Sequence, residues 1–259
     1  MKKCNLCLEL CELQDSHVIP NTVFRYIFRR NSGKGISLVV NDDSRIHYSS
    51  DSWSEDLLCL ECEEHLNKEY ENYSMGVLRN SISSVKFHRH SNGITFSNLD
   101  SLRFHLFFVS IIWRASISTH SAYSRIALSR LEPDLRGYLR STKNCRPLLL
   151  GVKISRLVSN NPCLYTMEAL KSFIISPFLK ERKKGFSFCF LIEGFFIEML
   201  VPHKYKDRKD KGVILPNKKV LHVPYLDVSS VPELSDILAS LHRKHFIENK
   251  SDISIKANK

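Results

Sequence analysis

The sequence has no long apolar run. Its two longest apolar stretches, FFVSIIW at 107–113 and FSFCFLIEGFFIEMLVP at 186–202, are too short or are interrupted by Glu193 and Glu198. A membrane-spanning helix needs about 20 apolar residues. The basic start MKKCNLC is followed by neither an apolar signal region nor a small-residue cleavage site. We therefore expect a cytoplasmic protein that does not associate with a membrane.

Several enzyme motifs are also missing. The chain has no internal repeat, no Walker loop and no dinucleotide-binding glycine fingerprint. Acidic residues are the minority, because 27 Asp and Glu stand against 38 Lys and Arg, which gives a formal net charge of +11. A surplus of this size favours a polyanionic partner, nucleic acid first and an anionic membrane surface second.

Four of the eight cysteines have a metal-ligand spacing. Cys4 and Cys7 form one CxxC pair, and Cys59 and Cys62 form a second. Two such pairs supply the four thiolates of a tetrahedral structural Zn²⁺ site. A redox CxxC is the rival interpretation, but neither pair opens a helix after an obvious strand.

The other four cysteines are expected to play smaller parts. Cys11, four residues after Cys7, is an alternative zinc ligand. Cys145, Cys163 and Cys189 lie among apolar residues and are expected to be buried thiols. Eight cysteines in a chain of this length do not make a disulfide scaffold.

A helical period begins at the second CxxC pair. One stripe of apolar and aromatic residues predicts a helix from about Glu61 to about Asn80; it consists of Leu66, Tyr70, Tyr73 and Val77. A neighbouring stripe carries the oxygen-bearing side chains of Glu63, Asn67 and Glu71. For Glu71 we expect an ordinary solvated helix face. His65 is expected at the surface or on a phosphate.

Three motifs together resemble the zinc-knuckle branch of the HNH, or ββα-metal, endonucleases. They are the first CxxC pair, SHVIP at 16–20 and LLCLEC at 57–62. LLCLECEEHLNKEYENY and FFVSIIWRASIS further resemble bacterial HNH-like proteins that are associated with antiviral defence. The motifs cover about the first 80 residues, and the looser helical signature reaches about residue 140.

The resemblance implies metal-dependent hydrolysis of DNA phosphodiester bonds. The family's first histidine is the general base that activates water, and His17 holds that position here. A cation, Mg²⁺ or Mn²⁺, would stabilise the phosphorane, with Glu63 and Asn67 as its candidate ligands and Glu63 as a second catalytic residue. A partner protein of a defence system is also implied.

The chain departs from the family pattern at three places. Ser16 stands where the family commonly has a metal-binding Asp, and Glu63 replaces the usual His or Asn. The family's Asn shortly before the second CxxC has no counterpart, because residues 54–56 are Ser, Glu and Asp. Carboxylate oxygen is a good ligand for Mg²⁺ or Mn²⁺. The alternative is a zinc-bearing nucleic-acid-binding or scaffold protein with a degenerate HNH fold and no catalysis.

The middle of the chain is predicted to be helical. SNLDSLRFHLFFVSIIWRASIS (97–118) is apolar nearly all round, as a buried helix is, with a capping-box-like Ser97 and Asp100. Its Arg114 should find a carboxylate or carbonyl partner inside the protein. SAYSRIALSR and EPDLRGYLRS are read as two more helices, the second with Pro133 in its first turn.

A basic strip follows in the same region. Its nucleic-acid-binding candidates are Arg125, Arg130, Arg136 and Arg140, continued by Lys143 and Arg146. Such a strip suits a phosphate backbone, although a basic run is often only a solvated face. HRH at 88–90 is read as a basic loop.

From about residue 150 the pattern favours strands, with EGFF as a hairpin turn and an amphipathic helix after Pro232. The fold class expected is α+β. It has an HNH-like zinc-knuckle module at 1–82, a helical region at 95–145 and a mostly antiparallel sheet region at 146–250 for target or partner recognition.

Overall fold

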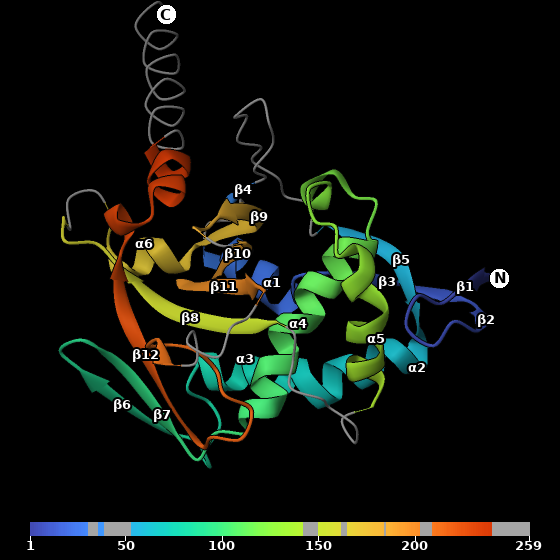
Figure 1. Ribbon diagram of the computed structural model, residues 1–259, viewed down its shortest axis with the longest axis horizontal. Coiled ribbons are helices and arrows are strands. Elements are labelled where there is room, and N and C mark those ends of the chain that lie inside the picture. The colour runs from blue at the N-terminus through green and yellow to red at the C-terminus, as the bar shows by residue number, and fades with distance from the viewer. Residues whose placement is uncertain are drawn as a thin grey trace, which may run out of the picture.

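The computed structural model describes residues 1–30, 36–38, 53–141, 150–161, 165–183, 185–202 and 209–239 (Figure 1). Its strands are β1 (Lys2–Lys3), β2 (Leu10–Cys11), β3 (Leu13–His17), β4 (Ile36–Leu38), β5 (Ser54–Cys59), β6 (Lys86–His90), β7 (Gly93–Ser97), β8 (Gly151–Val158), β9 (Phe173–Glu181), β10 (Phe186–Ile192), β11 (Phe195–Val201) and β12 (Val220–Asp227). Its α-helices are α1 (Asn21–Arg30), α2 (Leu60–Leu66), α3 (Asn72–Leu78), α4 (Ser101–Ile117), α5 (Glu132–Arg140) and α6 (Met167–Lys171), and residues 232–239 are also helical. The class is α+β, as expected.

Eight of the described strands form one mixed sheet. Their order is β4-β9-β10-β11-β8-β12-β7-β6. The pairs β4–β9 and β8–β12 are parallel, and the other neighbours are antiparallel. The sheet is therefore not confined to the C-terminal region, because β4, β6 and β7 come from the first hundred residues.

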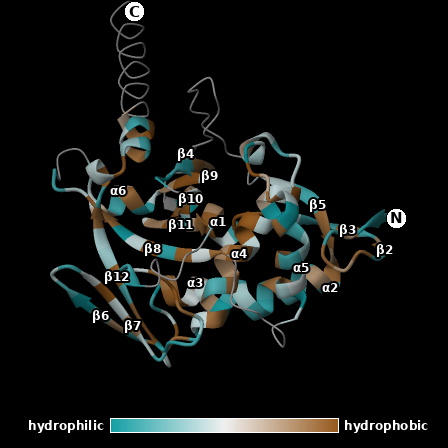
Figure 2. Cartoon of the chain, viewed as in Figure 1, coloured by the Kyte–Doolittle hydropathy of each residue, from teal (hydrophilic) through white to brown (hydrophobic). Residues whose placement is uncertain are grey.

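Helix α4 lies at the centre of the molecule. Most of its side chains are buried, including Trp113 and Phe104, and it contacts α3, α5 and β8. Figure 2 shows hydrophobic residues along α4 and β10, whereas β6 is mainly hydrophilic. Truncating a buried aromatic residue to Ala typically costs about 3–5 kcal/mol, so α4 is a principal source of stability.

The central strands are buried on both faces. Phe188 and Phe190 of β10 belong to the core cluster that contains α4, whereas Cys189 and Leu191 belong to a second cluster with α6 and helix 232–239. Strands covered on both sides need apolar residues at every position. This explains why β10 and β11 are almost wholly apolar, with Glu198 as the one charged residue in the two strands. Cys189 is the buried thiol that we expected.

The hairpin expected at EGFF joins β10 to β11. Ile192 pairs with Phe195, so the turn consists of Glu193 and Gly194, whose φ angles are 48° and 75°. Two-residue turns with both φ angles positive match the twist of the strands, and glycine adopts them without strain. Leu157 donates a backbone hydrogen bond to Gly194 at 3.0 Å, which fixes the turn on β8.

Other helix predictions hold with corrected ends. The helix expected from Glu61 to Asn80 runs from Leu60 to Leu78, with a π-helical turn, Asn67–Glu71, between α2 and α3. Asp100 caps α4 by accepting from the Arg103 backbone N–H at 3.1 Å. Ser97 takes no part in the cap because it ends β7.

Two predictions of local structure were wrong. SAYSRIALSR is not an α-helix: the chain holds two 3₁₀ turns there, Ser121–Tyr123 and Ser129–Leu131, which together with the stretch between them bury Tyr123, Ile126 and Leu128. HRH at 88–90 belongs to β6 rather than to a loop, since pairing with β7 overrides its polar composition. One core cluster contains residues from all three regions expected from the sequence.

Some predictions fall outside the described residues. They concern Lys143, Cys145, Arg146 and Cys163, and most of the segment between β4 and β5. Among the described helices, none has the length and apolar character needed to cross a bilayer.

Candidate functional site

The two CxxC pairs meet in space. The Sγ atoms of Cys4, Cys7, Cys59 and Cys62 all lie within 4.8 Å of one another, and those of Cys7 and Cys59 are 3.9 Å apart. Zinc–sulfur bonds of about 2.3 Å at tetrahedral angles place sulfur atoms about 3.8 Å apart. The four cysteines therefore form a group that fits a metal such as zinc.

Backbone hydrogen bonds hold the first CxxC pair against the second. The Cys4 N–H donates to the Glu9 carbonyl at 2.9 Å, which closes the turn between β1 and β2. Asn5 donates to the Leu57 carbonyl from its backbone N–H at 3.2 Å and from its side chain at 2.9 Å. The Cys59 N–H donates to Cys4 Sγ at 3.3 Å. These contacts join the N-terminal turn to β5 without the help of a metal.

The thiols differ in their acidity. Burial raises the pKa of Cys4, but backbone hydrogen bonds from Cys59, Cys7 and Leu6 outweigh it and bring the pKa to about 7. Burial and the neighbouring thiols raise the pKa of Cys7 and of Cys62. A bound cation would stabilise all four thiolates together, so metal binding would release protons.

Cys11 is not part of the group. Its thiol donates to the Glu9 carbonyl at 3.4 Å, and Cys11 pairs with Lys2 across the β1–β2 hairpin. The alternative in which Cys11 replaces a ligand therefore has no geometric support.

The second CxxC pair belongs to a unit of two strands and a helix, β3, β5 and α2. Strand β3 pairs antiparallel with β5 from Leu13 opposite Cys59 to His17 opposite Ser54. Helix α2 begins at the residue after Cys59, so the expectation that neither CxxC pair opens a helix after a strand was wrong for the second pair. Ser16 is fully buried, and its hydroxyl donates to Glu63 Oε2 at 2.9 Å. The end of β3 thus meets the first turn of α2.

His17 ends β3 and is half-buried. Val18, Ile19 and Pro20 follow it and are buried, and α1 then begins at Asn21. The SHVIP motif therefore fixes the backbone of His17 by burying the residues on both sides of it.

Arg114 links this unit to α4. Its side chain is only 1% exposed, and Nη1 donates to the His17 carbonyl at 2.6 Å. The same atom lies 3.7 Å from Glu63 Oε1, and Nη2 lies 3.5 Å from Glu71 Oε2. The expectation that Arg114 finds carboxylate and carbonyl partners is confirmed.

The π-helical turn decides which carboxylates face Arg114. In a regular α-helix, residues eight positions apart differ by about 80° around the axis. The wider turn at Asn67–Glu71 offsets part of this rotation, so Glu71 faces Arg114 as Glu63 does. Glu71 is only 9% exposed, so the expectation of a solvated position was wrong. Its burial raises its pKa, although the charge of Arg114 opposes this.

The candidate ligands of a second cation are only partly assembled. Glu63 Oε2 accepts from Ser16 and Oε1 faces Arg114, while Asn67 is exposed and lines an open hollow of about 280 Å³ with Glu63, Glu64 and Lys68. Within the described ranges, the four cysteines are the one group of three or more His, Cys, Asp or Glu donors within reach of a single ion. These residues do not form an oxygen cage for Mg²⁺ or Mn²⁺, since a guanidinium already balances the buried carboxylates.

His65 has a structural role rather than the surface role expected. Its Nε2 lies 2.9 Å from the Leu139 carbonyl of α5, and its ring packs edge-on against Tyr70. The Tyr70 hydroxyl donates to the same carbonyl at 3.2 Å. Together these residues fasten α5 to the helix that follows the second CxxC pair.

Only part of the predicted basic strip is exposed among the described residues. Arg125, Arg130 and Arg140 are exposed, but Arg136 is half-buried and lies 4.0 Å from Glu132. Glu132 also accepts from the Trp113 indole at 2.9 Å, so it is part of the packing of α4.

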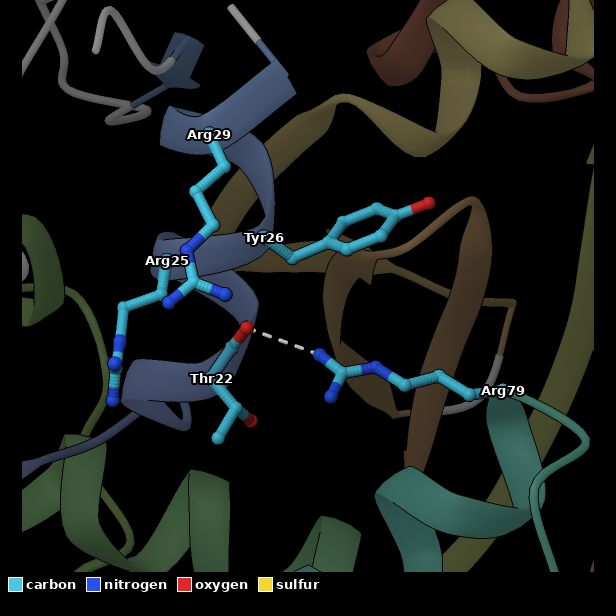
Figure 3. Close-up of a pocket in the computed structure, with 5 residues that line it drawn as sticks. All are labelled: Thr22, Arg25, Tyr26, Arg29 and Arg79. Atoms are coloured by element: carbon cyan, nitrogen blue, oxygen red, sulfur yellow. Dashed lines mark hydrogen bonds between the residues drawn. The ribbon is translucent and has the colours of Figure 1, made fainter.

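A second set of cations was missed by the sequence interpretation. Helix α1 carries Arg25 and Arg29, which line an open hollow of about 590 Å³ with Thr22, Tyr26 and Arg79 (Figure 3). Figure 3 shows Arg79 reaching from the end of α3 toward α1, where it donates to the Thr22 carbonyl at 3.0 Å. The available signal was the sequence of α1, which contains no acidic residue.

Comparisons with known proteins identify no relative of this chain: no protein-family model, no curated protein and no solved structure matches it.

Proposed function

We propose that the chain is a zinc-stabilised, HNH-like endonuclease that hydrolyses DNA phosphodiester bonds. The observation that supports this most directly is the β3–β5–α2 unit, in which the cysteine group, the end of the strand that carries His17 and the first turn of α2 lie together. This order of elements agrees with the motifs on which the resemblance rests.

In this proposal the metal held by the cysteines has no direct role in the reaction. Four thiolates fill the coordination sphere of a structural zinc and leave no position for a substrate. Cys4, Cys7, Cys59 and Cys62 would hold that ion, and its contribution is to fix β3 against β5.

His17 is the proposed general base. Histidine is the side chain that ordinarily changes protonation near neutral pH, so its neutral ring accepts a proton from water as the water attacks phosphorus. The hydrogen bond from Arg114 to the His17 carbonyl and the packing of Val18 and Ile19 hold the backbone from which the ring projects.

Glu63 is proposed to support this arrangement through Ser16 and Arg114. No step of the proposal passes through a second cation, because the described residues do not build its site. Added Mg²⁺ or Mn²⁺ is therefore a variable of the experiment, and Glu63 and Asn67 are the protein ligands to substitute if cleavage requires it.

The test is cleavage of supercoiled plasmid by the purified protein with EDTA, Mg²⁺ or Mn²⁺. We expect wild-type protein to nick the plasmid and His17→Ala to be slower by about 10²-fold or more, with unchanged zinc content and DNA binding. His90→Ala, an exposed histidine of β6, is the matched control and should cleave normally. Equal cleavage by wild type and His17→Ala would show that His17 is not the base.

A second candidate is a zinc-bearing nucleic-acid-binding or scaffold protein without catalysis. The position of Arg114 favours it, because the guanidinium that holds the His17 carbonyl lies against Glu63 and Glu71 and is too buried to touch a phosphate. If wild-type protein binds DNA but does not cut it with any of the three additions, this second function replaces the first.

A further inference from the structure

The hollow beside α1 continues into a second one. The second hollow, of about 580 Å³, shares Tyr26 and Arg79 with the first. Its other cations are Arg89, Arg156 and Lys171, and its two carboxylates are Glu168 and Glu193. We call the two hollows together the basic groove.

Cations are in excess in the basic groove. Six Arg and Lys side chains face two carboxylates. Glu193 accepts two hydrogen bonds from Arg79 Nε and Nη2, at 2.9 and 2.5 Å, and Glu168 pairs with Lys171 at 2.6 Å. Among the described residues, no carboxylate pairs with Arg25, Arg29 or Arg89. A ligand that carries several negative charges would compensate this surplus.

The arginines of α1 have a spacing that suits successive phosphates. Arg25 and Arg29 are exposed, and they lie one helical turn apart, about 6 Å along the axis. Like charges at this spacing repel each other on a helix. Anionic groups at a comparable repeat would remove the repulsion.

Two of the other arginines are held in place. Arg156 is 5% exposed and donates from Nη1 to the Glu193 carbonyl at 2.5 Å, while the Glu193 carboxylate holds Arg79. Burial lowers the pKa of Arg156, and the charges of Glu168 and Glu193 oppose that shift. Fixed guanidinium groups bind anions with less loss of side-chain freedom than mobile ones.

The groove is also aromatic. Tyr26, Phe87 and Tyr225 line it and are half-buried. Arginine groups lie over several rings: Arg156 is 4.6 Å from the centroid of Phe195, and Arg79 is 5.7 Å from that of Tyr26. Aromatic rings beside guanidinium groups are the combination that binds unpaired nucleobases together with their phosphates.

We infer that the basic groove binds a single strand of DNA, with phosphates along Arg25 and Arg29 and bases against Tyr26 and Tyr225. Two hollows that share a wall suit a ligand that spans both. A duplex keeps its bases stacked inside and would leave the aromatic faces unused.

This inference deepens the proposed function. It rests on that function because the proposed nuclease is what would act on the bound strand. Thr22, whose carbonyl accepts from Arg79, is five residues after His17, so their Cα atoms are at most about 18 Å apart. A strand in the groove would therefore lie no further than this from the start of the segment that carries the proposed general base, at the Thr22 end of the groove.

The test is fluorescence anisotropy with labelled dT20 and the full chain as purified, in buffer with neither chelator nor added Mg²⁺ or Mn²⁺, where the metal on the cysteines is kept and no cleavage that depends on the added cations occurs. Arg25→Ala/Arg29→Ala should weaken binding and make the plot of log affinity against log salt shallower by about 1.4, since each single-strand phosphate contact contributes about 0.7. Lys218→Ala/Lys219→Ala removes the same charge from exposed residues outside the groove and should change neither quantity.

A second variant separates stacking from charge. Tyr225→Ala should weaken dT20 binding by about tenfold without changing the salt slope, because a base loses its ring contact but no phosphate contact is lost. Thermal unfolding of each variant confirms that it is folded. If the Tyr225→Ala protein binds as wild type does, the groove holds only a backbone and the inference is wrong.

Competition decides the class of ligand. Unlabelled dT20 should displace the probe far better than AMP, a matched duplex or oligoglutamate, and comparable displacement by any of these would overturn the single-strand assignment.

The proposed nuclease can fail separately: binding that depends on Arg25, Arg29 and Tyr225 without any plasmid cleavage retains the groove and rejects the nuclease. Cleavage that is unaffected by these substitutions, together with unchanged dT20 binding, rejects the groove alone.

Discussion

Nη1 of Arg114 lies 3.7 Å from Oε1 of Glu63, so a buried arginine faces the carboxylate that the sequence indicates as a cation ligand. The same guanidinium holds the His17 carbonyl and approaches Glu71. Helix α4 therefore supplies the positive charge of this site from within the protein.

Arg114→Met should destabilise the protein by about 3–5 kcal/mol, because it leaves the buried Glu71 and the half-buried Glu63 without their counter-charge. The double variant Arg114→Met/Glu71→Gln should recover part of this loss, since one of those charges is then removed. The measurement is the free energy of unfolding in urea. Arg103→Met is a control on the same helix, with bonds to the Glu69 and Lys68 carbonyls, and should cost less. A loss below about 1 kcal/mol for Arg114→Met would contradict a buried ion pair.

Purified protein should contain about one Zn²⁺ per chain, because four thiolates complete one tetrahedral site. Cys59→Ser should remove most of the metal and lower the unfolding temperature, since metal binding and folding are coupled. Cys11→Ser, outside the group, should retain both. The checks are metal analysis by mass spectrometry and thermal unfolding with and without a chelator. A metal-free wild type with unchanged thermal stability would exclude a structural metal.

Glu55 should make the free energy of unfolding depend on pH in the acid range. Burial raises the pKa of Glu55, but hydrogen bonds from Ser118, Thr119 and the His120 N–H outweigh it and hold the pKa below its ordinary value of 4.5. A carboxyl with a lowered pKa stabilises the fold above the unfolded-state pKa, and this contribution is lost as pH falls through the folded-state pKa. Glu55→Gln should therefore reduce stability at pH 7 and flatten its decline below about pH 4.5.

The readout is urea unfolding between pH 3 and pH 7, with Glu12→Gln as an exposed control. An unchanged pH profile in Glu55→Gln would show that these hydrogen bonds do not stabilise the fold.

The basic strip of α5 should respond unevenly to substitution. Arg140→Ala should weaken duplex DNA binding and reduce the salt slope by about 0.9, the value for one phosphate contact. Arg136→Ala should change the slope less, because Glu132 already offsets its charge. Binding isotherms at several salt concentrations test this, and an unchanged slope in Arg140→Ala would show that the strip faces away from DNA.

Local patterns predicted the cysteine group and the main helices. A CxxC pair places two ligands within four residues, and the apolar stripe after Cys62 has a helical period. Both patterns are local, so both features could be predicted without knowing the fold. The position of Glu71 could not, because a π-helical turn inside a helix leaves no clear mark in the sequence.

The basic groove could not be predicted either, for a different reason. Its cations come from α1, the end of α3, β6, β8 and α6, from Arg25 to Lys171 in the chain. Only the order of strands in the sheet brings Arg89 of β6 and Arg156 of β8 to one hollow. The polar composition of HRH predicts a loop, so the sequence gives no sign that Arg89 lies in the sheet.

The meeting of the two CxxC pairs closes the segment between β3 and β5 at its base. Both of its ends are pinned by the cysteine group and the β3–β5 pairing, so doubling its length would cost only about 0.6 kcal/mol in loop-closure entropy alone. Helix α1 lies within that segment, and its buried Val23 and Phe24 tie it to the core. Evolution or design could therefore vary the exposed Arg25 and Arg29, which face the ligand, while the buried side of α1 and His17 stay in place.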